Sequence, residues 1–202
     1  MDIYTCIAKR RDTRHFTNEP VPEEILNKAI MAAHHGPSVG LTEPWRFVRV
    51  KSEEKREQIK NLFTKASKEA EKSVIEPKTK EKYKSLKLEA ILDAPIGLAI
   101  FCDHGVLDDF TIGTIGNANT LEWSCACAIQ NMWLSLTAEG FGAGWVSIMD
   151  YEAFADILEI PKNWKPLGYF CIGKPATDYD GEPMLQNENW KKRSKKPLII
   201  EV

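Results

Sequence analysis

Residues 119–149 read NTLEWSCACAIQNMWLSLTAEGFGAGWVSIM. Apolar side chains would cover much of the circumference of a helix over residues 119–139, so we predict a long helix at the centre of the fold. The three glycines between positions 140 and 144 break this pattern, and residues 145–149 are typical of a strand. Ser147 is expected on this partly buried strand, where its hydroxyl needs a hydrogen-bond partner.

The glycines of this stretch do not form a dinucleotide fingerprint. A Rossmann glycine loop follows a strand and opens a helix, whereas this one follows a helix and enters a strand. We expect these glycines to let the backbone turn tightly and pass close to a flat ring.

Outward from this stretch, helices and strands follow one another along the chain. Helical spacing predicts helices at residues 2–9, 22–35 and 119–139, and two more within 52–92, separated at Pro77 and with Leu86 to Leu92 in the second. Apolar runs predict strands at residues 45–50, 97–102, 145–149 and 169–171, followed by an extended, apolar end after Lys195. Long helical segments separate the strands, which favours an α+β or α/β sheet packed by helices, and residues 1–202 are expected to form one domain.

Composition excludes several classes of protein. The 202 residues are 43% apolar and 28% charged, which is ordinary globular usage rather than that of a disordered chain. With 27 basic and 29 acidic residues, the net charge of −2 gives no general reason to expect nucleic acid or an acidic membrane as a partner. Neither a membrane-spanning run nor a signal-peptide core is evident, so we expect a cytoplasmic protein.

The sequence offers little support for a metal or a nucleophilic triad. The five cysteines fit reduced core thiols better than disulfides. His34 and His35 are adjacent, and Cys125 and Cys127 would point to different faces of a helix, so we predict no metal site. No nucleophile elbow occurs, and His15 is expected to be an exposed polar residue.

Three arginines lie within the five residues Arg10 to Arg14. Guanidinium groups match phosphate oxygens, so this cluster could hold a phosphate dianion, although a surface salt-bridge cluster is the alternative. Asp12 stands among these cations, is expected to be ionised, and could orient a neighbouring group. The glycine- and proline-rich loop 36–45 could wrap a planar ligand or serve only as a turn.

Taken together, these segments resemble the FMN-dependent nitroreductase superfamily and, within it, the BluB-type 5,6-dimethylbenzimidazole synthases. The likeness follows chain order from Arg10-Arg11-Asp12 with Arg14 to Trp190 with Arg193. Its most specific parts are Asp12, the stretch Ser85-Leu-Lys-Leu-Glu89 and the stretch Gly144-Trp-Val-Ser147. Segment 113–122 departs from the synthase pattern.

The resemblance implies a nitroreductase-like α+β fold with a mainly antiparallel sheet and a domain-exchanged homodimer that binds FMN across its interface. It implies that Arg10, Arg14 and Arg193 hold the phosphate, that residues 37–39 come from the partner subunit, and that residues 72–92 form a lid, with Tyr83 to Glu89 over the ring. The full set of implied FMN contacts is Arg10, Arg11, Asp12, Thr13, Arg14, Pro37, Ser38, Val39, Leu86, Gly144, Trp145, Ser147 and Arg193.

The implied reaction consumes reduced FMN and O₂ and releases 5,6-dimethylbenzimidazole, the lower ligand of vitamin B12, with erythrose 4-phosphate. Asp12 and Ser147 match the catalytic positions: Asp12 is expected to assist proton transfer or position the flavin, and Ser147 to hydrogen-bond the ring or ribityl region. A separate flavin reductase using NAD(P)H could supply the reduced FMN.

Two other functions stay open. One is an ordinary flavoenzyme that passes electrons from NAD(P)H to a nitro compound, quinone or halogenated aromatic while FMN stays bound. The altered segment 113–122 favours this alternative, whereas Asp12 and Ser147 argue against it. The other is a flavin-binding protein without catalytic activity.

Overall fold

The computed structural model of the protein describes residues 1–117, 119–177 and 181–202. A sheet of four antiparallel strands lies at its centre, in the order β1 (Trp45–Arg49), β2 (Ile96–Asp103), β4 (Trp164–Gly173) and β3 (Gly142–Val146). This arrangement confirms the α+β fold with an antiparallel sheet. Within the described ranges, no helix is both long and apolar enough to cross a membrane.

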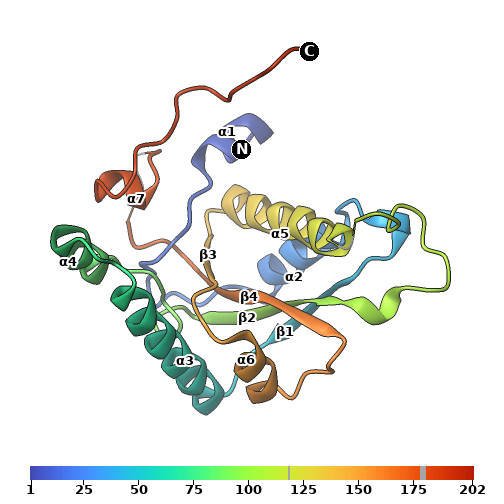
Figure 1. The fold of residues 1–202 in the computed structure, drawn as a ribbon, viewed down its shortest axis with the longest axis horizontal. Coiled ribbons are helices and arrows are strands. Elements are labelled where there is room, and N and C mark those ends of the chain that lie inside the picture. The colour runs from blue at the N-terminus through green and yellow to red at the C-terminus, as the bar shows by residue number, and fades with distance from the viewer. Residues whose placement is uncertain (118, 178–180) are drawn as a thin grey trace.

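Helices cover both faces of the sheet (Figure 1). One face packs against α2 (Glu23–His34) and α5 (Thr120–Ala138), with α1 (Ile3–Lys9) against α5. The other packs against α3 (Glu53–Lys72) and α6 (Tyr151–Ile157), and α4 (Pro77–Ser85) lies beside α3. The remaining short elements are the 3₁₀ turns η1 (Val39–Leu41) and η2 (His104–Val106) and the helix α7 (Met184–Asn187).

Strand β2 divides its side chains between two cores. Leu98, Ile100 and Cys102 pack toward α2 and α5, whereas Ala99 and Phe101 pack toward α3 and α6. Side chains of a strand point alternately to opposite faces, and both faces are covered, so the strand is apolar from Ile96 to Cys102, before its last residue, Asp103. The buried helix predicted at 119–139 is confirmed as α5, whose core-facing residues include Leu121, Cys125, Ile129, Met132 and Leu136.

The predicted strand at 145–149 is wrong in its position. Strand β3 begins at Gly142 and ends at Val146, because Gly142 and Gly144 are extended, buried strand residues rather than turn residues. A Cβ atom at Gly144 would lie 2.1 Å from the backbone oxygen of Thr13 and 2.2 Å from Nη1 of Arg14. Glycine is therefore needed here for close approach of another chain segment, while only Gly140 of the three has a positive φ, of 79°.

The second helix predicted within 52–92 is shorter than expected. It ends at Ser85, and the residues from Leu86 to Ala90 belong to no regular helix. Side chains replace the helical hydrogen bonds: Arg56 donates to the carbonyl oxygens of Ile91 and Ala94, and Glu89 accepts from the backbone N–H of Ile91 at 2.7 Å. Ala90 and Ile91 are buried by this irregular segment.

The last strand is longer than predicted, and the apolar end is not part of the core. Strand β4 extends over Trp164–Gly173, with an irregularity in its pairing opposite Ile100 and Phe101. The end after Lys195 has no regular secondary structure, and Leu198, Ile199 and Ile200 are 88%, 77% and 74% exposed.

Candidate functional site

The segment from Arg10 to Arg14 leaves α1 and lies beside strand β3. Thr13 donates its N–H to the carbonyl oxygen of Ala143 at 2.9 Å, and Asp12 forms a parallel bridge with the same residue. Alternate residues of an extended segment point in opposite directions. Arg11 and Thr13 line a cavity of about 620 Å³ that Arg10, Asp12 and Arg14 do not line.

Asp12 and Arg14 hold both polar groups of the Trp145 peptide backbone. Oδ1 of Asp12 accepts the Trp145 N–H at 2.8 Å, and Nη2 of Arg14 donates to the Trp145 carbonyl oxygen at 2.8 Å. The two side chains also form an ion pair with each other. Three residues expected at the site are thereby joined through hydrogen bonds that fix the approach of the segment to β3.

Asp12 occupies a partly desolvated position. Its side chain is 43% exposed, whereas that of Arg14 is 6% exposed. Desolvation raises the pKa of Asp12 above its ordinary value of 3.8, although Arg14 and the Trp145 N–H act in the opposite direction. A carboxyl group whose pKa is raised can hold a proton more readily than a free aspartate.

Arg10, Arg11 and Arg193 are close enough for their charges to interact. Burial lowers the pKa of Arg10 and of Arg11, and the positive charge of Arg193 lowers both further, although Asp12 acts in the opposite direction on Arg10 and Glu182 does so on Arg11. The Arg10 guanidinium lies over the Trp133 ring, 4.6 Å from its centroid, and Nε of Arg11 is buried without a hydrogen bond to any described residue. Like charges held together in this way favour an anion between them.

Ser147 does not lie where the sequence predicts. It follows the end of β3 and is exposed, rather than sitting on a partly buried strand. The shift has the same cause as that of the strand, because β3 is displaced toward its glycines. Ser147 remains two residues beyond Trp145, whose backbone Asp12 holds.

The loop carrying Pro37, Ser38 and Val39 lies at the other end of α5. Val39 donates its N–H to Oγ of Ser124 at 3.0 Å, near the start of the helix, whereas Arg10 stacks on Trp133 farther along. These two positions on α5 are about 14 Å apart along the helix axis. The described subunit therefore does not bring this loop together with the arginine cluster.

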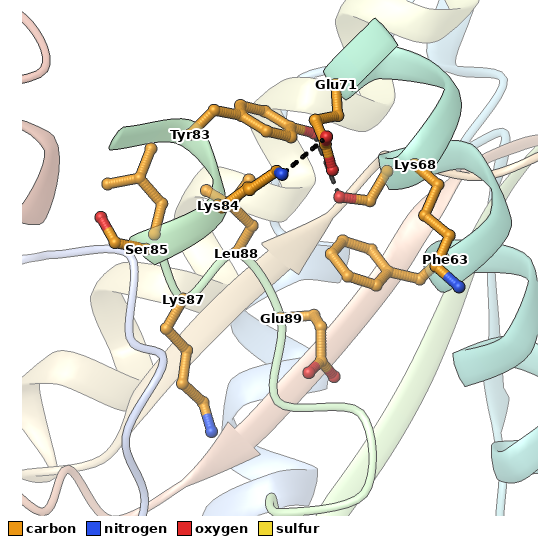
Figure 2. Close-up of a pocket in the computed structure, with 11 residues that line it drawn as sticks. Phe63, Lys68, Glu71, Tyr83, Lys84, Ser85, Lys87, Leu88 and Glu89 are labelled. Carbon is orange, nitrogen blue, oxygen red and sulfur yellow. Dashed lines mark hydrogen bonds and ion pairs between the residues drawn. The ribbon is translucent and has the colours of Figure 1, made fainter. Parts of the chain in front are cut away.

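The predicted lid borders a cavity of about 430 Å³ between α3 and α4 (Figure 2). Its lining includes Phe63, Ser67, Tyr83, Leu86 and Leu88. The hydroxyl groups of Ser67 and Tyr83 lie 3.2 Å apart, and Nζ of Lys84 lies 3.2 Å from Oε1 of Glu71. These contacts join α4 to α3 through side chains at the cavity.

The lid also contacts the segment that leads to Arg193. The rings of Tyr83 and Trp190 have centroids 6.2 Å apart, and Lys82 donates to the backbone oxygen of Asn189. A change in the position of α4 would therefore act on the C-terminal arginine.

Several structural contributors were not singled out from the sequence. Arg56 is one of them, and it holds the base of the predicted lid by donating to the carbonyl oxygen of Ile91. Glu89 is part of the stretch that carries the resemblance, but its contact with the Ile91 N–H is not evident from any local spacing. The structure also groups Cys102, His104 and Glu122 at a place separate from the arginine cluster, although no metal site is predicted from the sequence. Within the divergent segment 113–122, Ala118 lies outside the described residues.

Comparisons with known proteins show that the chain is similar to nitroreductase-family proteins along most of its length. The sequence model of the nitroreductase family matches residues 7–174. A 5,6-dimethylbenzimidazole synthase of Rhodospirillum rubrum is 35% identical over 191 residues, which are 94% of this chain and 89% of the relative.

Two solved structures share the fold. A BluB-like flavoprotein of Clostridium difficile has a TM-score of 0.73 at 22% identity, with all of both chains covered. An iodotyrosine deiodinase bound to FMN and 3-iodo-L-tyrosine has a TM-score of 0.77 at 20% identity, covering 99% of this chain and 98% of the other.

Proposed function

The chain belongs to the nitroreductase family, and from this premise we propose that it binds FMN and catalyses the oxygen-dependent fragmentation of reduced FMN to 5,6-dimethylbenzimidazole and erythrose 4-phosphate. The observation that carries the proposal is the Asp12–Arg14–Trp145 arrangement beside the arginine cluster. Sequence similarity to a 5,6-dimethylbenzimidazole synthase over 94% of the chain supports the same reaction.

The residues present fit an FMN phosphate. Arg10, Arg11 and Arg193 repel one another, and the buried Nε of Arg11 makes no hydrogen bond to a described residue. A phosphate dianion would offset this repulsion and accept hydrogen bonds from these guanidinium groups. We assign the phosphate to Arg10, Arg11 and Arg193, and we assign Arg14 to holding the backbone of β3.

Asp12 and Ser147 would supply the polar groups for the reaction. The flavin, when bound and reduced, supplies the electrons that O₂ requires and the carbon skeleton of the product. Asp12, with its raised pKa and its fixed contact to Trp145, would hold or transfer a proton. Ser147, exposed just beyond the end of β3, would donate a hydrogen bond to the ligand.

We propose that a second copy of the chain completes the site. Residues 37–39 and the arginine cluster lie at opposite ends of α5, so one subunit does not surround a single ligand with both. Large apolar side chains are exposed on α1, where Tyr4 is 81% exposed, and on the C-terminal segment from Leu198 to Ile200. Burial of these surfaces against a partner would favour a homodimer with exchanged segments.

The lid would exclude water from the reacting groups. Its charged outer surface stays solvated, while Tyr83 and Leu86 border the cavity between α3 and α4. Closing this segment over a bound ligand would protect reactive species from hydrolysis.

One experiment separates the proposed reaction from the two alternatives. Purified protein receives an excess of reduced FMN in air, and the organic products are identified by mass spectrometry. We expect 5,6-dimethylbenzimidazole in amounts that exceed a protein-free control. Intact FMN with consumption of NAD(P)H and of a nitro, quinone or halogenated acceptor would instead identify an ordinary flavoenzyme, and binding without either reaction would identify a flavin carrier.

A binding experiment tests the phosphate assignment independently of turnover. Arg10→Ala should weaken FMN binding about tenfold or more, because a charge-assisted hydrogen bond is lost. Riboflavin, which lacks the phosphate, should bind wild type and variant alike. An equal loss of affinity for FMN and for riboflavin in Arg10→Ala would contradict the phosphate assignment.

A further inference from the structure

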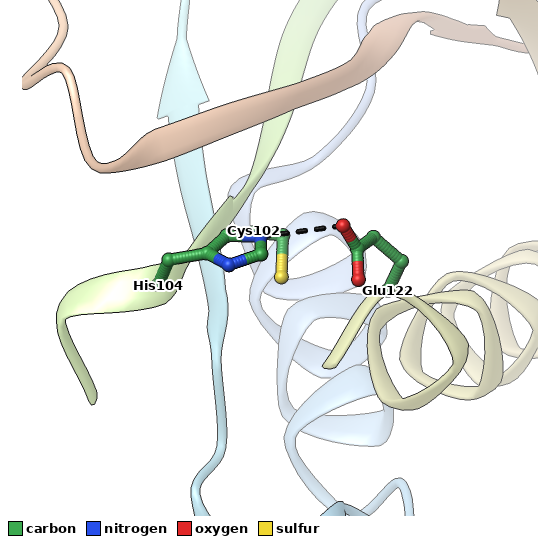
Figure 3. Close-up of side chains that lie close together, drawn as sticks. All are labelled: Cys102, His104 and Glu122. Atoms are coloured by element: carbon green, nitrogen blue, oxygen red, sulfur yellow. Dashed lines mark ion pairs between the residues drawn. The ribbon is translucent and has the colours of Figure 1, made fainter. Parts of the chain in front are cut away.

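A cluster of three metal-ligating side chains lies where strand β2 meets the start of α5 (Figure 3). Cys102 is the penultimate residue of β2, His104 follows in η2, and Glu122 lies in the first turn of α5. Their ligand atoms all lie within 4.8 Å of one another. The cluster is distinct from the Arg10–Arg14 segment and from the lid, and the proposed flavin reaction does not use it.

The spacing of these residues suits a shared centre. Cys102 lies near the end of β2 and His104 in the η2 turn that follows, and their ligand atoms approach within 4.8 Å of each other. Glu122 and Cys125 are three residues apart on α5 and share a helix face. Cys125 lies against Cys102, and the two thiols are within hydrogen-bonding reach of each other. The sequence pattern is thus C-x-H followed by E-x-x-C.

Two polar atoms of the cluster have no hydrogen bond to any described residue. They are Nε2 of His104 and Oε2 of Glu122, and both are buried. Nε2 of His104 lies 3.2 Å from Oε1 of Glu122, which also receives Nζ of Lys165 at 2.7 Å. A simple ion pair accounts for Nε2 of His104 and Oε1 of Glu122, but it leaves the buried Oε2 of Glu122 without a partner among the described residues.

We propose that Cys102, His104 and Glu122 bind a divalent transition-metal cation of the zinc class. Zinc bonds of about 2.0 Å to nitrogen or oxygen and about 2.3 Å to sulfur place tetrahedral ligand atoms roughly 3.3–3.5 Å apart. The histidine and glutamate atoms are already at this separation, so modest side-chain adjustment would bring the thiolate into place. A water molecule would supply the fourth ligand.

The charges of the site suit this cation. A thiolate and a carboxylate together neutralise two positive charges, and a neutral imidazole adds a third donor. Lys165 is the competing cation at Glu122, and its side chain is 55% exposed, so it can move into solvent when the metal binds. The side chain of His104 is 36% exposed, so the cation would reach the site from solvent beside this residue.

The metal would have a structural role. It would tie the end of β2 to the first turns of α5, beside Ser124, whose hydroxyl accepts the Val39 N–H. The loop of residues 37–39, which is proposed to contact the ligand of the partner subunit, is therefore anchored at Ser124, next to Cys125. Metal binding should stabilise this corner without taking part in electron transfer.

A metal titration tests the proposal. Reduced full-length protein is freed of metal with a chelator and titrated with Zn²⁺ against a chromophoric competitor, and bound metal is counted by elemental analysis. We expect one equivalent per chain, with affinity that rises with pH because the thiol must lose its proton. Co²⁺ should give a sulfur-to-metal absorption band.

Matched variants assign the ligands. His104→Ala and Glu122→Gln should weaken Zn²⁺ binding at least about 100-fold, while Cys127→Ser, on the exposed side of the same helix, should bind as wild type does. Cys102→Ser should remove the Co²⁺ band. Flavin content is measured in each variant. A folded variant that binds flavin but no metal shows that the metal site is independent of the proposed flavin function. Binding of less than about 0.2 equivalents of Zn²⁺ per chain would overturn the proposal. An equal loss of Zn²⁺ binding in Cys127→Ser would also overturn it.

Discussion

The Arg10–Arg14 segment and the α3–α4 pair are both rich in charge, but their charges have different surroundings. Arg14 is nearly buried and donates to a backbone carbonyl of β3. In α3, by contrast, Lys72 and Glu69 form an ion pair whose side chains are 69% and 62% exposed. Exposed ion pairs contribute little to stability, whereas a buried charge that holds backbone groups fixes a chain segment in place. Charge content alone therefore does not locate a site.

The largest expected effect is on the free energy of unfolding, at Gly144, where strand β3 lies very close to the Arg10–Arg14 segment. Gly144→Ala places a Cβ atom 2.1 Å from the backbone oxygen of Thr13, which cannot rotate away. We expect the free energy of unfolding to fall by about 3 kcal/mol or more. Urea denaturation measures this change. Gly140→Ala is the control: it has a positive φ but no atom within 4 Å of its Cβ position, so it should cost only about 1 kcal/mol.

Catalysis should depend on Asp12 in the first region and on Ser147 just beyond the end of β3. Asp12→Asn preserves an oxygen that can accept the Trp145 N–H but removes the exchangeable proton, so formation of 5,6-dimethylbenzimidazole should fall about 100-fold. Ser147→Ala should reduce it about tenfold. Single-turnover product analysis with FMN binding measured in parallel tests both, and full activity in both variants would refute the assignment of these residues.

Loss of the partly buried ion pair should have an intermediate effect on stability. Arg14→Gln removes the partner of Asp12 and the donor to Trp145, and we expect a loss of about 2 kcal/mol, below the usual 3–5 kcal/mol for a buried pair because Asp12 is 43% exposed. Thermal and urea unfolding measure the loss. An unchanged unfolding free energy would mean that the contact to β3 is not maintained in solution.

A smaller change is expected with pH. Because desolvation raises the folded-state pKa of Asp12 above 3.8, the folded protein binds a proton that the unfolded chain has released. This proton stabilises the folded state fully at pH values below the unfolded-state pKa of Asp12. The stabilisation is lost as the pH rises through the folded-state pKa of Asp12. The unfolding free energy of wild type minus that of Asp12→Asn should therefore decrease over this interval. NMR titration of the Asp12 carboxyl carbon gives the pKa directly, and a value below 3.8 would contradict the prediction.

The smallest effect is expected in the second region. Lys72→Ala removes an exposed ion pair and should change the unfolding free energy by less than about 0.5 kcal/mol. The same measurement under low and high salt provides the control, because a screened surface pair loses its contribution as salt increases. A loss comparable to that of Arg14→Gln would remove the distinction between the two regions.

The sequence was most informative where local pattern and tertiary environment agree. The apolar circumference of residues 119–139 predicts a central helix, and α5 does bury one face in the core, although Trp123 and Cys127 are exposed on its other side. The cluster of arginines from Arg10 to Arg14 is likewise evident in the local sequence, although its contact with β3 is not. These features depend on residues that are close together in the chain.

Other features depend on partners distant in sequence and could not be predicted in this way. Gly142 and Gly144 disfavour a strand by propensity, yet close packing against Thr13 and Arg14 requires them in β3. Glu89 and Arg56 replace helical hydrogen bonds beyond Ser85 through contacts that no local spacing reveals. Cys102 and Glu122 come together only when β2 packs beside α5.

The strand order has a consequence for synthesis of the chain. The central strand β2 pairs with β4 such that Ile96 faces Ile172 and Asp103 faces Trp164. A ribosome therefore releases β2, which is apolar from Ile96 to Cys102, long before its second neighbour exists. Until β4 emerges, one edge of β2 can pair with other chains, so nascent protein should be the form most prone to aggregation and most dependent on chaperones.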